Sequence, residues 1–142
     1  MIIRTNIYLL CKYEDTDSSS VYELRGWVNK LYNSSDVSTF QSQFIKWINE
    51  YDLAIIRVDL ENKGLFTDEE TNSGQTTGFT LFENNHDKIK VPIVFWCFDE
   101  NNVLEFKKLK ERYPNHRMSY LLKNNDKSHL REEVIDRLFP CT

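Results

Sequence analysis

The chain has 142 residues, of which 22 are acidic and 18 are basic, giving a formal net charge of -4. This length fits a single domain over residues 1–142. An aromatic content of 13% excludes a chain that is disordered throughout. Apolar runs stay far below the roughly 20 residues of a transmembrane helix. The sequence also lacks the clustered positive charge of a general nucleic-acid-binding protein, so we expect neither a membrane nor a nucleic-acid partner.

Cysteine use indicates the compartment. Cys11, Cys97 and Cys141 are odd in number and widely spaced, a pattern that matches neither a disulfide framework nor a zinc motif. Reduced thiols of this kind are usual in the cytoplasm. Arg4 also interrupts the apolar start of the chain before the core of a secretory signal can form. We therefore expect a cytoplasmic protein.

Short apolar, β-prone runs alternate along the chain with segments in which apolar residues recur at helical spacing. The first part of the chain predicts a strand at Ile7–Leu10, a helix over Ser18–Leu31, a brief strand at Val37–Thr39 and a helix over Phe40–Tyr51. The second part predicts a strand at Leu53–Val58, a helix over Gly78–Phe82, a strand at Val91–Phe98, a helix from Asp99 to Tyr113, a strand at Met118–Leu122 and a terminal helix from Asp126 or Ser128 to Leu138.

One long segment, from Glu61 to Thr77, is polar and carries no clear periodicity. A connection of this length is uncommon in a compact domain, and we expect a flexible surface loop. Its acidic triplet, Asp68–Glu70, lacks the alternating acid spacing of a calcium loop. We therefore expect no metal at this triplet.

The alternation of strands and helices predicts an α/β domain. We expect a flavodoxin-like, doubly wound sheet of five parallel strands with helices on both faces. Leu53–Val58 is almost wholly apolar, as expected for a parallel strand that is covered on both faces. Folds of this class place their sites at the carboxyl ends of the strands. The segments expected there are Cys11–Asp17, Arg57–Glu61, Cys97–Asp99 and Lys123–Asn125.

Four blocks of the sequence resemble the receiver domains of response regulators. Tyr51–Leu60 is similar to the third strand of that family, and Thr77–Phe82 is similar to its glycine-led third helix. Val91–Cys97 resembles the fourth strand and Ser119–Asn124 the fifth. The blocks follow the order and spacing of the family, so the resemblance covers essentially the whole chain. It implies a role in signal transduction.

The residues that would carry the phosphotransfer chemistry of a receiver are changed here. The resemblance implies a phosphoryl-accepting carboxylate where this chain has Arg57, a permanent cation. It implies a hydroxyl where the chain has Cys97. It also implies an acidic pair where the chain has Lys12 and Tyr13, and the acids Glu14 and Asp15 come two residues later. Lys123 matches the lysine of the family. These departures predict a degenerate receiver, or pseudo-receiver, without aspartyl phosphorylation.

A pseudo-receiver is expected to act as a protein-interaction module rather than as an enzyme, without a cofactor. The resemblance places its docking face over Phe98, Phe106, Tyr113 and Tyr120. We further expect Arg57 to lie at the end of its strand and to replace the charge of a metal ion. Its carboxylate partner is expected among Glu14, Asp15, Asp17 and Asp59.

Two alternatives remain open. Asp59 lies two residues beyond Arg57 and on the same side of the strand, so it could accept a phosphoryl group with the help of Mg²⁺. Alternatively, Asn6–Leu10 and Asp52–Ile56 resemble strands of nucleoside 2-deoxyribosyltransferase-like enzymes. Ser73–Gly78 lacks the acid that this second family carries before its fourth strand, which weakens the enzyme alternative.

Overall fold

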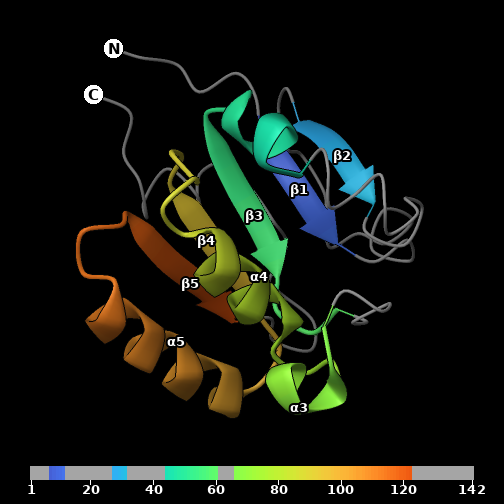
Figure 1. The fold of residues 1–142 in the computed structure, drawn as a ribbon, viewed down its shortest axis with the longest axis vertical. Coiled ribbons are helices and arrows are strands. Elements are labelled where there is room, and N and C mark those ends of the chain that lie inside the picture. The colour runs from blue at the N-terminus through green and yellow to red at the C-terminus, as the bar shows by residue number, and fades with distance from the viewer. Residues whose placement is uncertain (1–6, 12–26, 32–43, 61–65, 123–142) are drawn as a thin grey trace.

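The computed structural model describes residues 7–11, 27–31, 44–60 and 66–122 of the chain (Figure 1). Its strands are β1 (Ile7–Cys11), β2 (Trp27–Leu31), β3 (Leu53–Arg57), β4 (Ile93–Cys97) and β5 (Met118–Leu122). Its helices are a helical segment at residues 44–49, α3 (Asp68–Thr71), α4 (Thr77–Asn85) and α5 (Glu100–Arg112). Within these ranges no helix combines the length and the apolar character that crossing a membrane requires.

The strands form one sheet in the order β2-β1-β3-β4-β5, and every neighbouring pair is parallel. The register aligns Tyr8 with Ala54, Ala54 with Ile93, and Ile93 with Met118. Parallel neighbours need crossover connections, which are helical wherever the structure describes them between β3, β4 and β5. The prediction of an α/β architecture with a parallel sheet is therefore confirmed.

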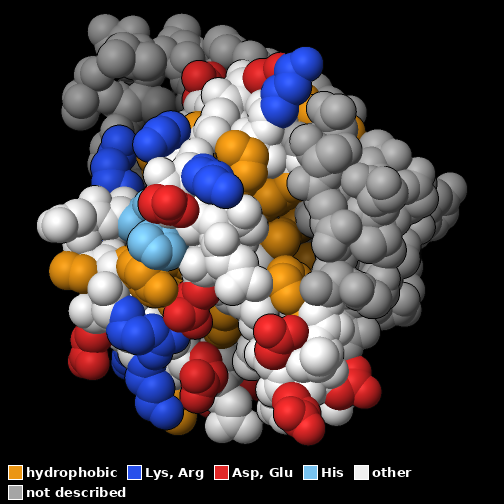
Figure 2. Space-filling model, in the orientation of Figure 1, with side chains coloured by type: hydrophobic (Ala, Val, Ile, Leu, Met, Phe, Trp, Pro, Cys, Tyr) orange, Lys and Arg blue, Asp and Glu red, His pale blue; other side chains and the backbone are white. Residues whose placement is uncertain are grey.

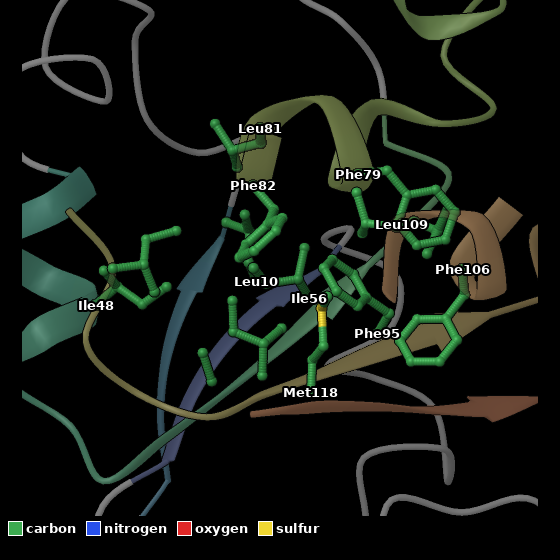
Figure 3. Close-up of a cluster of buried hydrophobic side chains, with 14 of the residues drawn as sticks. Leu10, Ile48, Ile56, Phe79, Leu81, Phe82, Phe95, Phe106, Leu109 and Met118 are labelled. Carbon is green, nitrogen blue, oxygen red and sulfur yellow. The ribbon is translucent and has the colours of Figure 1, made fainter. Parts of the chain in front are cut away.

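One face of this sheet carries the main core (Figure 3). Alternate strand residues such as Ile56 and Phe95 point toward the helices, because successive side chains of a strand lie on opposite faces. The rings of Phe82 on α4 and Phe95 on β4 meet edge to face, with centroids 5.8 Å apart. The helical segment 44–49, α4 and α5 all contribute to this cluster, through Ile48, Phe79, Phe82, Phe106 and Leu109 among others.

The opposite face of the central strands is covered as well. Four side chains of β3 and β4 point away from the main core, and each is fully buried: Leu53, Ile55, Val94 and Trp96. Burial on both faces explains why β3 and β4 read as continuous apolar runs, which is typical of parallel strands. The terminal helix expected after Asp126 or Ser128, which would belong to a second helical layer, lies outside the described residues.

The N-terminus of α4 packs directly onto the carboxyl end of β3. The Gly78 amide donates a hydrogen bond of 2.9 Å to the Val58 carbonyl, and the Thr77 hydroxyl donates to the Leu60 carbonyl. A Cβ atom on Gly78 would lie 2.6 Å from the carbonyl oxygen of Arg57 and 2.9 Å from the Val58 Cα. Glycine is therefore required for this approach, which holds the backbone on which Arg57 is mounted.

The expected helix over Ser18–Leu31 is wrong in its last part, because Trp27–Leu31 forms β2. Short apolar sets of this kind fit either a helix or a strand by spacing alone. Tertiary pairing decides the outcome, since residues 27–31 supply the backbone partners of β1 from Ile7 to Cys11. The brief strand expected at Val37–Thr39 lies outside the described residues.

The expected loop over Glu61–Thr77 is also wrong in part, because Asp68–Thr71 forms the short helix α3. The Thr67 hydroxyl accepts from the Glu70 amide at 3.1 Å, and the Glu70 carboxylate accepts from the Thr67 amide at 2.9 Å. This reciprocal pair is a capping box, and its sequence pattern of Thr67 followed three residues later by Glu70 would have indicated the helix. The cap expected at Asp99 for α5 is confirmed, as its carboxylate accepts from the Asn102 amide at 2.8 Å.

Replacing Gly78 with alanine should destabilise the fold. Alanine normally stabilises a helix relative to glycine by about 0.5–1 kcal/mol, but here the new methyl group would collide with backbone atoms of β3. We expect Gly78→Ala to lower the free energy of unfolding in urea by about 1–3 kcal/mol. Asn84→Ala, at an exposed position of the same helix, is the control and should leave stability unchanged or slightly raised. A Gly78→Ala variant as stable as the wild type would contradict the close approach.

Candidate functional site

The carboxyl ends of β3 and β4 meet at one edge of the sheet. β3 ends at Arg57, which lies in register with Trp96 of β4. Asp59 lies two residues beyond the end of β3, and Phe98 and Asp99 follow β4. This edge therefore gathers a cation, carboxylates and aromatic rings.

Arg57 is the centre of this cluster. It is only 6% exposed, and its Nε donates to Asp59 Oδ1 at 2.6 Å while Nη2 donates to Oδ2 at 3.3 Å. The guanidinium carbon lies 4.0 Å from the centroid of the Phe98 ring and 6.0 Å from that of Trp96. A two-pronged ion pair and a stacked aromatic face are both arrangements that suit the planar guanidinium. The ion pair expected at Arg57 is present, with Asp59 as its partner.

Cys97 does not join this cluster. Its neighbour Trp96 faces the Arg57 side, so Cys97 points to the opposite face, where it is fully buried in the main core. Burial raises the pKa of the Cys97 thiol to about 12, with smaller contributions from the charges of Asp99 and Asp59. The thiol is therefore protonated at neutral pH and offers neither a nucleophile nor a metal-binding thiolate.

The other residues predicted for the site, Glu14, Asp15 and Lys123, lie outside the described residues. Among the residues that the structure does describe, no three His, Cys, Asp or Glu side chains gather closely enough to hold a metal ion. The described part of the site thus consists of Arg57, Asp59 and the aromatic rings beneath the guanidinium. The sequence pattern does not predict that Phe98 stacks on the guanidinium. It places Phe98 on a docking face instead.

The four aromatic residues expected to form a docking face are not equally available. Phe106 is buried, with its ring centroid 5.2 Å from that of Tyr120 and 6.0 Å from that of Phe95. It is a core residue, as its spacing of three from both Val103 and Leu109 on α5 would have indicated. Phe98, Tyr113 and Tyr120 are half-buried.

A second group of polar residues lies at the amino-terminal edge of β4 and β5, around a hollow of about 330 Å³. The His116 Nε2 donates to the Val91 carbonyl at 3.1 Å, and the ring of His86 lies 4.5 Å from that of Tyr113. Figure 2 shows these histidines in pale blue. Burial lowers the pKa of His116, the hydrogen bond to the Val91 carbonyl partly opposes this, and the nearby charges of Lys110 and His86 lower the pKa further. This hollow contains a histidine whose neutral form is favoured by folding.

Comparison with protein-family models, with curated proteins and with solved structures gives no match for this chain.

The ion pair of Arg57 and Asp59 should be strongly coupled because the Arg57 side chain is only 8% exposed. A double-mutant cycle with Arg57→Met and Asp59→Asn, measured by urea unfolding, should give a coupling free energy of about 1–3 kcal/mol. The exposed pair of Lys108 and Glu105, with side chains 65% and 46% exposed, is the matched control. Its cycle with Lys108→Met and Glu105→Gln should give about 0–0.5 kcal/mol. Equal couplings for the two pairs would show that burial adds nothing at Arg57.

The lowered pKa of His116 should make stability depend on pH. Below the ordinary histidine value of 6.5 the unfolded chain binds a proton that the folded protein resists, so the free energy of unfolding should fall as the pH decreases. His116→Gln keeps a donor for the Val91 carbonyl and should lose less stability than the wild type between about pH 8 and about pH 5. His86→Gln removes only the smallest cause of the shift and should keep most of the slope. Parallel curves for wild type and His116→Gln would contradict the shift.

Proposed function

We propose that the chain is a degenerate receiver-like domain that acts in signalling by binding a protein partner, without phosphorylation of an aspartate. The strand order β2-β1-β3-β4-β5 supports a flavodoxin-like fold, because the flavodoxin-like class has this order. The four blocks that resemble receivers coincide with β3, α4, β4 and β5. The free thiol of Cys97 agrees with a cytoplasmic location, which is part of the proposal.

The observation that carries this proposal is the buried, ion-paired Arg57 at the end of β3. A phosphoryl acceptor at this position must present a carboxylate oxygen to the phosphorus atom. The guanidinium stays protonated under all physiological conditions and has no such oxygen. Its fixed charge would also repel a divalent cation, while itself neutralising Asp59 at 2.6 Å.

The alternative acceptor, Asp59, is engaged by the same cation. Both of its oxygens accept hydrogen bonds from Arg57, and these bonds stabilise the resting carboxylate against attack on a phosphorus atom. The hydroxyl that would help to hold a phosphoryl group is also missing, since Cys97 is buried on the other face. These two features support the interaction module over the phosphorylatable receiver.

Incubation with Mg²⁺ and acetyl phosphate, followed by intact-mass measurement, tests the proposal. The wild-type chain should gain no phosphoryl group, because its acceptor position holds Arg57. A competent receiver in the same mixture is the positive control and should be phosphorylated. A gain of one phosphoryl group that Asp59→Asn abolishes would overturn the proposal and establish Asp59 as the acceptor.

A further inference from the structure

Residues of α3, of the turn after it and of α5 line a hollow of about 740 Å³. Figure 1 shows these two helices beside the carboxyl edge of the sheet. One wall comes from α3 and the turn that follows it. The other wall comes from α5. Among its lining residues, Asn101, Leu104, Lys108 and Glu111 are spaced three or four apart and therefore share one face of the helix.

Leu104 gives this wall an apolar contact point. It is 56% exposed, and among the described residues it is the large hydrophobic side chain that is left in solvent. Its neighbours on α5, Val103 and Phe106, point the other way and are buried in the core. Leu104 therefore contributes nothing to that core, and covering it would favour association in proportion to the apolar area removed from water.

The charge of the hollow is negative. Five acidic residues line it, against two basic ones, Lys107 and Lys108, and acidic side chains gather over α3 in Figure 2. The acidic residues are Glu69, Glu70, Asp99, Glu105 and Glu111. Glu70 and Asp99 cap helices, and Glu105 pairs with Lys108 at 3.4 Å. The remaining two, Glu69 and Glu111, have no ion-pair partner within the described part of the chain. They are available to a cation from outside.

We propose that this hollow docks an extended basic segment of a partner protein. Lysine or arginine side chains of the segment pair with Glu69 and Glu111, and one apolar side chain covers Leu104. A second copy of this chain is disfavoured because each copy carries a net charge of -4. Nucleic acid is excluded by the same sign of charge. The inference rests on the proposed function as an interaction module and identifies its docking surface and the chemistry of its partner.

A synthetic peptide with lysines on both sides of one leucine is the probe. Its binding is measured by fluorescence anisotropy, and its position by amide chemical shifts in the labelled protein. Shifts should centre on α3 and α5, and the double variant with Glu69→Gln and Glu111→Gln should bind about ten-fold more weakly. Leu104→Ser should weaken binding of this peptide about five-fold. A second peptide, in which serine replaces the leucine, should bind Leu104→Ser and the wild type with the same affinity.

Glu50→Gln is the matched control, because Glu50 is an exposed carboxylate outside the hollow. It should leave the affinity of the peptide unchanged. Each Glu→Gln substitution removes one negative charge at the surface. Circular dichroism checks that every variant, including Leu104→Ser, is folded. The proposal is overturned if the peptide does not bind, if the shifts map to another surface, or if the double variant with Glu69→Gln and Glu111→Gln binds no more weakly than Glu50→Gln does.

These outcomes are independent of the phosphorylation experiment. A peptide that does not bind, together with a chain that accepts no phosphoryl group, overturns the docking surface and leaves the degenerate receiver intact. A peptide that binds in the hollow of a chain phosphorylated on Asp59 supports the docking surface and overturns the absence of phosphotransfer.

Discussion

The burial of β3 on both faces is the constraint on which the rest of the structure depends. All five of its residues are buried, and β1 and β4 flank it on either side. A strand in this position tolerates a charge at its end only where that charge is paired and stacked. The contacts of Arg57 with Asp59 and Phe98 meet that requirement. The same burial requires glycine at position 78, where α4 packs onto the end of the strand.

The cluster around Arg57 connects the fold to the proposed function. In a switch that works by phosphorylation, charge at this edge changes when a phosphoryl group arrives. Here a cation is built into the strand and is already neutralised by Asp59. An edge arranged in this way is suited to a domain that keeps one conformation and does not switch between two. A domain of this kind would communicate through what docks on its surface, and the negatively charged hollow beside α5 is close to the same edge.

The two edges of the sheet differ in their chemistry. At the carboxyl edge the cation is the guanidinium of Arg57, which stays protonated under all physiological conditions. At the amino-terminal edge, His116 is half-buried, and this burial lowers its pKa and so favours the neutral ring. Protonation of His116 therefore acts at the edge that lies away from the proposed docking surface.

Residue order alone determined the parallel α/β class, because the apolar runs of β3 and β4 and the amphipathic period of α5 are local patterns. It also indicated the cap at Asp99 and the ion pair of Arg57, since two residues on one side of a strand end can reach each other. Tertiary structure decided the rest. Trp27–Leu31 became a strand because β1 needs a hydrogen-bonding neighbour. Phe98 became the platform for Arg57 because β3 and β4 lie side by side, a neighbourhood that residue order does not show. The burial of Phe106, by contrast, agrees with its helical spacing on α5.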